Sequence, residues 1–591
     1  SAVYNSGLLI LNNVTFINNN ANVGAAIMNF GSVILNGCTF INNSANLGAA
    51  ISNGGSVILN DCTFINNTAG SGGVIYNMGV MDLDGVVFIN NTAQFGSAIC
   101  NDGAVDLVDG VFINNSAESS GTVYNGGLLD LVNGVFINNS AQQGGAILNA
   151  GSVDLVDGVF INNSAQYGGA IYDISNISCK NSKFMDNAAL FGSAVYTIGA
   201  LERVSFDACR FESKCFGKYG LVVIYYSNLL INNSLFTNSS AEYAPAIFIW
   251  SGSAITINNT HFIDLKAAQT AGAVAAYGYE RISVENSWFI NTTSAKNGGA
   301  IFIDKNNGQL TEGSVNIYNS SFINASSNYG GAYVQLSNNL TLSNSEFVDC
   351  RSNYDGGAIY LSDVSAEIRN SSFVSNRNGE HDDYPTYGGA IYCDYGNLSV
   401  HGSRFINNSA FTGGGTIGIY DSLYLISDSA FDGGEAIHAT FKRNGSEVVN
   451  CLGNYSICDD EVFYPQVVIG SEMELTLVTN EINVETLPIR FDLRDFNWNA
   501  SVTDQGYSTA CWAFASAEAL ESALLKSSGL NIHFSENNMQ NTMLLYSRYG
   551  STYVGGAING VAVGYLLSWL GPILDENDTF DEVGKISPVF Q

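Results

Sequence analysis

The sequence predicts a mainly β protein, in which a parallel β-helix of about 17 coils precedes a smaller domain that contains a helix. Three observations support this prediction. Phenylalanine recurs every 24 residues over the first part of the chain, and each unit between two phenylalanines holds three short β-type runs. After about residue 440 the repeat stops, and an alanine- and leucine-rich helical pattern follows. A fixed period of this length indicates a stacked repeat architecture.

The phenylalanine spacing is too strict to be a bias of composition. Eight phenylalanines lie 24 residues apart without a slip, and nine more follow at less regular intervals. The regular positions are Phe16, Phe40, Phe64, Phe88, Phe112, Phe136, Phe160 and Phe184, and the others are Phe211, Phe236, Phe262, Phe289, Phe322, Phe347, Phe373, Phe405 and Phe431. Seventeen coils at the usual strand spacing of about 4.8 Å would form a rod of about 80 Å.

One unit, from Gly144 to Ala165, shows why strands are expected. Its runs AIL, SVDLV and GVFIN are separated by glycine, asparagine and aspartate, which favour turns. This much glycine and asparagine would destabilise a helix. Three short strands per turn of chain are typical of a parallel β-helix, in which each coil pairs with the next.

Asparagines form further columns in the repeat, and we expect them to be structural. One column lies eleven residues before each phenylalanine, and the asparagine pair after FI forms two more. At a turn, a stacked amide can donate to one neighbour and accept from the other, which satisfies the polar groups that the bend exposes. The first column consists of Asn5, Asn29, Asn53, Asn77, Asn101, Asn125 and Asn149.

The paired motifs GGAI and F-x-x-N resemble the repeats of chlamydial polymorphic outer membrane proteins and, more closely, the adhesin-like surface proteins of methanogenic archaea. The resemblance covers about residues 1–440 and implies a right-handed parallel β-helix exposed on a cell surface. N-x-S/T sequons within the repeats also permit glycosylation outside the cell. Because β-helices serve as adhesins, stalks and polysaccharide-cleaving enzymes, the motif indicates the fold more sharply than the function.

Composition limits the partners. The net charge is −32, from 21 Lys+Arg and 53 Asp+Glu, which argues against nucleic acid and anionic membrane surfaces. The longest nearly uncharged apolar stretch, residues 560–574, is too short to span a bilayer. Eleven cysteines in 591 residues do not form a disulfide framework. Cys38 and Cys62 should stack on adjacent coils, as buried thiols or as a bridge, and Cys451 with Cys458 is a further candidate pair.

Two features of the β-helix are candidate binding sites. Four aspartates in one phase should form a column of carboxylates, which is either a solvated acidic face or a calcium site: Asp82, Asp106, Asp130 and Asp154. Two long loops, residues 304–313 and 376–385, interrupt the repeat where ligands usually bind. The second loop could line a glycan site through Glu380, His381, Asp382 and Asp383, but it lacks the basic residues expected of a polyuronate lyase.

The carboxy-terminal residues contain a candidate nucleophile. The run AFASAEALESALL has apolar residues at i, i+3 and i+4 spacing, which predicts a helix that begins at Cys511. A thiol at the N-terminus of a helix lies at the positive end of the dipole, which lowers its pKa toward a reactive thiolate. The expected organisation is therefore a β-helix over 1–445, a connecting segment over 446–486 and a helix-containing domain over 487–591.

This last domain resembles the N-terminal, helical part of the papain-like (C1 family) α+β cysteine peptidases. LPIRFDLRD at 487–495 looks like the start of the mature enzyme, and DQG at 504–506 precedes the candidate nucleophile at the family's distance. FSENN at 534–538 and GPILDEND at 571–578 look like two later family segments. The order and spacing of these motifs agree over about 105 residues.

The resemblance implies a role for individual residues. Cys511 would be the nucleophile, and Gln505 would donate its side-chain amide, with the Cys511 backbone N–H, to the oxyanion of the tetrahedral intermediate. Trp512, Gly555 and Gly556 would border the substrate cleft. The family's chemistry implies no cofactor, and no metal site is assigned.

Two departures from the family pattern affect these expectations. Ser508, Thr509 and Ala510 replace the usual C-G-S, so the disulfide made by that cysteine is not expected. The family's histidine and asparagine should follow the nucleophile by roughly 130–150 residues, whereas the sequence has 80 residues after Cys511. We therefore expect this chain alone not to cleave peptides, and a longer product to do so.

The leading functional hypothesis is a secreted or cell-surface, adhesin-like β-helix protein that carries a papain-like cysteine peptidase acting on proteins or wall peptides. The first alternative is a non-enzymatic adhesin with a degenerate peptidase-like module, and the second is a polysaccharide-acting β-helix. In each case the β-helix could bind a cell-surface or glycan ligand.

Overall fold

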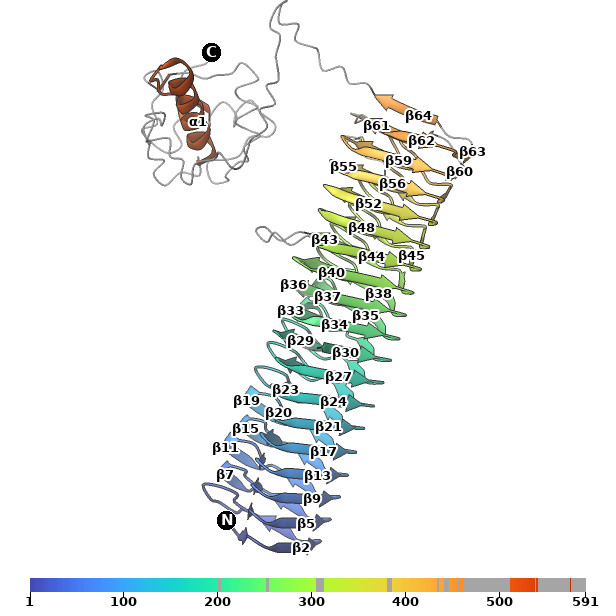
Figure 1. The fold of residues 1–591 in the computed structure, drawn as a ribbon. Helices are drawn as coiled ribbons and strands as arrows, with labels where there is room; N and C mark the ends of the chain where they lie inside the picture. Colours follow the sequence, from blue (N-terminus) through green and yellow to red (C-terminus); the bar gives the residue numbers. More distant parts are fainter. Residues whose placement is uncertain are drawn as a thin grey trace, which may run out of the picture. The chain divides into compact units, whose positions relative to one another are not determined.

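The computed structural model describes residues 1–199, 203–250, 254–304, 313–379, 385–432, 435–440, 446–453, 456–460, 511–536, 538–539 and 574–575. The chain divides into two compact units, Ser1–Gln466 and Val467–Gln591, and each is described by itself. The first unit is a parallel β-helix of about 17 coils, which confirms the fold that the repeat predicts. Figure 1 shows its coils stacked one on the next in chain order.

A single coil consists of three short strands, for example β20 (Val123–Asn125), β21 (Leu128–Val132) and β22 (Val135–Ile137). Each strand pairs in parallel with the equivalent strand of the next coil, so that the coils build three sheets. Sheet 1 runs from β1 (Val3–Asn5) to β64 (Ser456–Asp460), sheet 2 from β2 (Leu8–Asn12) to β62 (Glu447–Val449) and sheet 3 from β3 (Thr15–Ile17) to β63 (Leu452–Gly453). A short fourth sheet contains β7 (Ser44–Leu47), β11 (Thr68–Gly72), β15 (Thr92–Phe95) and β19 (Ser116–Ser120).

The seventeen phenylalanines form one continuous column inside the β-helix. All are buried, from Phe16 to Phe431. The rings of neighbouring coils stack with their centroids 4.4–5.1 Å apart and their planes within 9° of parallel. This spacing matches the separation of paired strands, so the ring column and the sheets share one rise per coil. The repeat period was therefore a correct guide to the core.

The asparagine columns are structural, as predicted. In the first column the Nδ2 of Asn101 donates to the Oδ1 of Asn125 at 2.8 Å, and its Oδ1 accepts the backbone N–H of Gly103 at 3.0 Å. The two asparagines after FI have different roles. Asn114 is exposed and has a left-handed backbone with a φ of 54°, whereas Asn115 is buried in a column of stacked amides. Asparagine suits both positions because it tolerates positive φ and carries a donor and an acceptor.

The two glycines of the GGAI motif are required for different reasons. Gly144 has a φ of 60°, a conformation in which a Cβ would be strained. At Gly145 an added Cβ would lie 2.4 Å from the carbonyl oxygen of Gly169 in the next coil. The motif therefore recurs because one position needs a left-handed turn and the next needs room for a neighbouring backbone.

The cysteines of the β-helix are buried thiols at most positions. Cys38 and Cys62 lie on adjacent coils, are fully buried and are not bonded to each other, so the thiol interpretation holds and the bridge does not. Burial raises the pKa of Cys62 to about 12, which makes this thiol unreactive. Cys451 is also a free thiol, so the pairing considered with Cys458 is not formed.

Strand pairing continues beyond residue 445, where the β-helix was expected to end. β59 (Leu423–Ser427) pairs with β62, β60 (Ala430–Asp432) pairs with β63, and β61 (Glu435–Thr440) pairs with β64. β62, β63 and β64 thus extend all three sheets although their residues lack the sequence signature of the repeat. Backbone hydrogen bonds make these pairs, and they need no repeat-specific side chain.

Asp173 ends the first asparagine column and gives the β-helix a pH-dependent weak point. It replaces an asparagine, is fully buried, and accepts a hydrogen bond from the Nδ2 of Asn149 at 2.7 Å. Burial raises its pKa from 3.8 to about 6, against the opposing effect of hydrogen bonds from Asn149 and Thr197. The stability that the neutral acid provides is complete below pH 4 and is lost as the pH rises through about 6.

We therefore expect Asp173→Asn to raise the stability of the surrounding coils by up to about 3 kcal/mol at pH 8 and to have little effect at pH 4. An asparagine would continue the amide column without a buried charge. Thermal unfolding of both proteins at the two pH values checks this. An equal difference in Tm at pH 4 and pH 8 would show that ionisation of Asp173 is not the cause.

Candidate functional site

Most of the described residues of the second unit belong to helix α1 (Cys511–Ser528), which begins at Cys511 as the sequence predicts. Ala513, Phe514, Ala517 and Glu521 are its buried residues and recur at the spacing of one helical face. The helix ends at Gly529, which has a φ of 70° and donates its N–H to the carbonyl oxygen of Leu525 at 3.0 Å. This left-handed glycine is a common helix stop, because it satisfies a free carbonyl without strain.

Cys511 is the first residue of α1. The first backbone N–H groups of a helix have no partner within the helix, and the helix dipole is positive at that end. Both effects favour the thiolate over the thiol of a cysteine placed there. The backbone thus provides the electrostatic setting that the sequence predicts for a nucleophile.

Glu521 connects α1 to the segment that follows it. Its side chain is buried, its Oε1 accepts the backbone N–H of Phe534 at 2.7 Å, and its Oε2 lies 3.3 Å from the Nδ1 of His533. His533 therefore faces a position ten residues beyond Cys511, which is about 15 Å along the helix axis. This distance argues against His533 as the catalytic base for Cys511.

The two later family-like segments meet beside this contact. Phe534 forms an antiparallel bridge with Leu574, and the N–H of Asp575 donates to the carbonyl oxygen of His533 at 2.9 Å. Ser535 accepts the N–H of Asn538 at 2.9 Å through its hydroxyl group, as a helix-capping serine does. The start of FSENN and the middle of GPILDEND, 40 residues apart in sequence, are thus neighbours.

Several predicted site residues lie outside the described part of the chain. These are Gln505, Gly555 and Gly556, together with the side chains of Cys511 and Trp512. The described residues therefore place the helix that bears the predicted nucleophile and the scaffold behind it. The oxyanion donor and the cleft glycines stay predictions from the resemblance.

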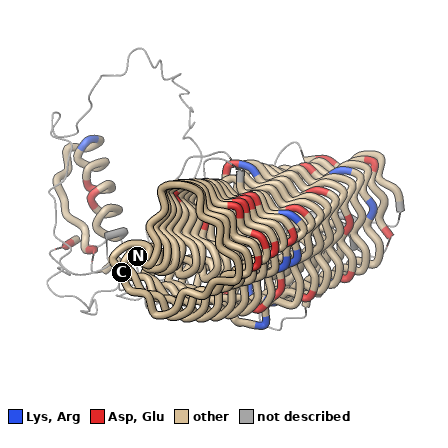
Figure 2. The backbone as a smooth tube through the Cα atoms, turned by 90° about the horizontal axis from the view of Figure 1, so that it is seen from below, with Lys and Arg blue, Asp and Glu red and all other residues tan. Residues whose placement is uncertain are grey.

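The acidic column of the β-helix forms as predicted. Asp82, Asp106, Asp130 and Asp154 stand in register on neighbouring strands of sheet 2, and all four are exposed. Partial burial, followed by the charges of Asp154 and Asp106, raises the pKa of Asp130. Figure 2 shows acidic positions on neighbouring coils. Within the described ranges no three histidine, cysteine or acidic residues are grouped to hold a metal ion.

The loop cluster proposed for glycan recognition is not placed. Glu380, His381, Asp382 and Asp383 lie outside the described residues, as do residues 305–312 of the other loop. Neither loop therefore contributes to the site argument below.

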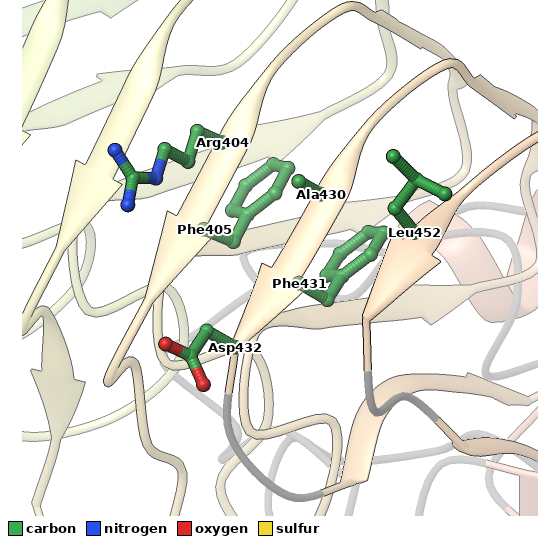
Figure 3. Close-up of a pocket in the computed structure, with 6 residues that line it drawn as sticks. All are labelled: Arg404, Phe405, Ala430, Phe431, Asp432 and Leu452. Carbon is green, nitrogen blue, oxygen red and sulfur yellow. The ribbon is translucent and has the colours of Figure 1, made fainter.

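A small surface pocket lies where the phenylalanine column ends. It has a volume of about 190 Å³ and is lined by Arg404, Phe405, Ala430, Phe431, Asp432 and Leu452. Figure 3 shows the two rings side by side, with the guanidinium and carboxylate groups pointing away from them. Phe431 pairs with Gly453 in the next strand, so that strand adds no phenylalanine at this position. The pocket is a consequence of that ending and contains no catalytic pair.

Comparisons with known proteins agree with both halves of this description. Residues 487–552 match the papain family of cysteine proteases. Residues 61–78 and 157–173 match the polymorphic membrane protein repeat of Chlamydia. A search of curated proteins finds no match. The chain is thus a parallel β-helix protein with repeats similar to those of Chlamydia polymorphic membrane proteins and a C-terminal segment similar to the papain family.

Glu521 was not singled out from the sequence, although a signal for it exists. Glu521 lies eight residues after Ala513 and four after Ala517, so it is a charged residue on the same helical face as these two alanines. Such a residue is expected to have a buried partner. Its partners, the backbone N–H of Phe534 and the imidazole of His533, could not be inferred because their positions depend on the chain path after α1.

No helix within the described parts of the chain is both long enough and apolar enough to cross a membrane.

Proposed function

We propose that this protein is an extracellular, adhesin-like β-helix protein that presents a papain-type cysteine peptidase acting on proteins or wall peptides. The observation that supports it most directly is the start of α1 at Cys511, within the segment that matches the papain family. The surface location rests on the polymorphic membrane protein repeats and on the acidic composition. The similarity to adhesin-like proteins of methanogenic archaea belongs to the same proposal.

The proposed chemistry follows from the place of Cys511 at the start of α1. A thiolate at Cys511 attacks the carbonyl carbon of a peptide bond, and the carbonyl oxygen becomes an oxyanion. The Cys511 backbone N–H and the amide of Gln505 would donate to that oxyanion. The leaving amine needs a proton from an acid, which a histidine provides in the papain-like scheme. His533 is not suited to be this acid, because it contacts Glu521, which lies ten residues after Cys511 in α1.

Thiol reactivity tests the proposal on the chain itself. The protein offers a matched control, because Cys215 is an exposed cysteine of the β-helix and most of the other described cysteines are buried. We expect iodoacetamide to alkylate Cys511 at least about tenfold faster than Cys215 at pH 6.5, since a helix N-terminus lowers a thiol pKa from about 8.5 to between about 3.5 and 7.5. Mass spectrometry of each cysteine-containing peptide measures both rates.

Peptide hydrolysis tests the activity. The protein in its natural secreted form should cleave a peptidyl-coumarin amide in the presence of a thiol reductant. Cys511→Ala should abolish cleavage and Cys215→Ser should leave it unchanged. Equal alkylation of the two cysteines, or cleavage that survives Cys511→Ala, would contradict the peptidase proposal and favour a non-enzymatic adhesin.

A further inference from the structure

Two exposed tyrosines occupy turn positions that disfavour their side chains. Tyr226 and Tyr395 follow the strands of sheet 1 and have φ values of 51° and 53°. They are the only aromatic residues with a left-handed backbone in the described part of the chain. Their side chains are 44% and 50% exposed, so burial of the ring does not offset the strain. A strained residue that packing does not require indicates a function.

The neighbouring coils show what the turn itself requires. At the position equivalent to Tyr395, the coils before and after have Asp363 and Asp421, and elsewhere in this column stand Gly199 and Gly278. Aspartate and glycine tolerate positive φ far better than tyrosine does. The turn can therefore form without an aromatic residue, and the tyrosine is present for another reason.

Polar groups suited to hydroxyl ligands surround Tyr395. The preceding residue, Asp394, accepts a hydrogen bond at its Oδ2 from the hydroxyl of Tyr360 at 3.2 Å. Asp394 as a whole is half-buried, with its Oδ1 atom inside the protein, so Oδ2 is the oxygen that a surface ligand can reach. The ring of Tyr395 meets that of Tyr420 edge to face, with centroids 5.4 Å apart and planes at 75°. Because the Tyr395 ring is not stacked flat on that of Tyr420, one of its faces can contact a ligand.

The negative charge of this surface indicates which class of ligand it can bind. Residues 354–363, 386–396 and 411–423, which form sheet 1 and its turns over these three coils, contain no lysine or arginine and include four aspartates, namely Asp355, Asp363, Asp394 and Asp421. An anionic polymer would be repelled. A neutral sugar fits, because its hydroxyls can hydrogen-bond with the half-buried pair of Tyr360 and Asp394 Oδ2, and its apolar face can pack on an aromatic ring.

We propose that Tyr395, Asp394, Tyr360 and Tyr420 form a binding subsite for a neutral polysaccharide on the outer face of sheet 1. Tyr395 is the aromatic platform, and Asp394 is the acceptor for a sugar hydroxyl. A second exposed platform stands several coils away, where Tyr226 meets Tyr225 at 4.5 Å and Trp250 is 37% exposed in the adjacent coil. A polymer that follows the axis of the coils could contact both. The inference is independent of the peptidase proposal.

Affinity electrophoresis of the full chain in native gels tests this subsite. The gels contain a soluble neutral β-glucan, mannan or galactan, and polygalacturonate serves as the anionic counterpart. We expect at least one neutral polysaccharide, but not polygalacturonate, to retard the protein. Tyr395→Gly should weaken that binding at least tenfold while the thermal stability stays equal or rises, because glycine relieves the strained φ.

Two further variants distinguish the parts of the subsite. Tyr395→Phe should retain most of the binding, since it keeps the ring, and Asp394→Asn should weaken it. Tyr318 is a matched control, an exposed tyrosine of β44 (Ser314–Tyr318) in sheet 2, and Tyr318→Ala should bind as the wild type does. Absence of retardation by all three neutral polysaccharides, preference for polygalacturonate, or unchanged binding by Tyr395→Gly would overturn the proposal.

Discussion

Asn115→Ala is expected to destabilise the coils around it by about 3–5 kcal/mol. Asn115 is fully buried, and its Oδ1 accepts both the backbone N–H and the Nδ2 of Asn91 at 3.0 Å. Its Nδ2 donates to the carbonyl oxygen of Phe88 and to the Oδ1 of Asn139, also at 3.0 Å. Alanine removes all four bonds and leaves buried donors and acceptors on two other coils without partners.

The effect should be local, because each coil contacts only its neighbours. Hydrogen exchange should become faster in the coils next to Asn115 and stay unchanged at the two ends of the β-helix. Glu118→Ala, at an exposed position in the same coil, is the matched control and should change the stability by less than about 0.5 kcal/mol. A stability of Asn115→Ala within 1 kcal/mol of the wild type would mean that the amide column contributes little.

Glu521→Ala should loosen the peptidase segment by about 2–3 kcal/mol without altering the β-helix. The carboxylate is the acceptor for the buried N–H of Phe534 at 2.7 Å, and alanine would leave that donor unpaired. The segment that bridges to Leu574 would then separate from α1 more readily. Exchange of the Phe534 amide proton measures this opening directly.

The isosteric variant separates hydrogen bonding from charge. Glu521→Gln keeps an acceptor for the Phe534 N–H and loses only the negative charge that faces His533, so it should cost less than half as much as the alanine variant. Equal acceleration of exchange in both variants would show that the charge, and not the hydrogen bond, holds the segment.

Part of the candidate site was predictable because it depends on local sequence. The helix from Cys511 follows from alanine and leucine content and from apolar spacing, and the structure begins it at that residue. The contact of Phe534 with Leu574 joins residues 40 apart, and only the resemblance to a family suggested that these segments belong to one domain. The partner of Glu521 was not predictable, since a helical phase shows that a residue is buried but not what lies opposite.

In the β-helix the sequence by itself determined the rise, the three strands per coil, the phenylalanine core and the asparagine columns. A strict 24-residue period brings identical residues into register, so each contact repeats the one before it. Only the tertiary structure decided what happens where the period fails. β62, β63 and β64 pair although they lack the motif, Asp173 is buried where a column changes residue, and Tyr395 holds a strained turn beside Asp394. These features depend on neighbours one coil away in space, and an irregular stretch of sequence does not specify those neighbours.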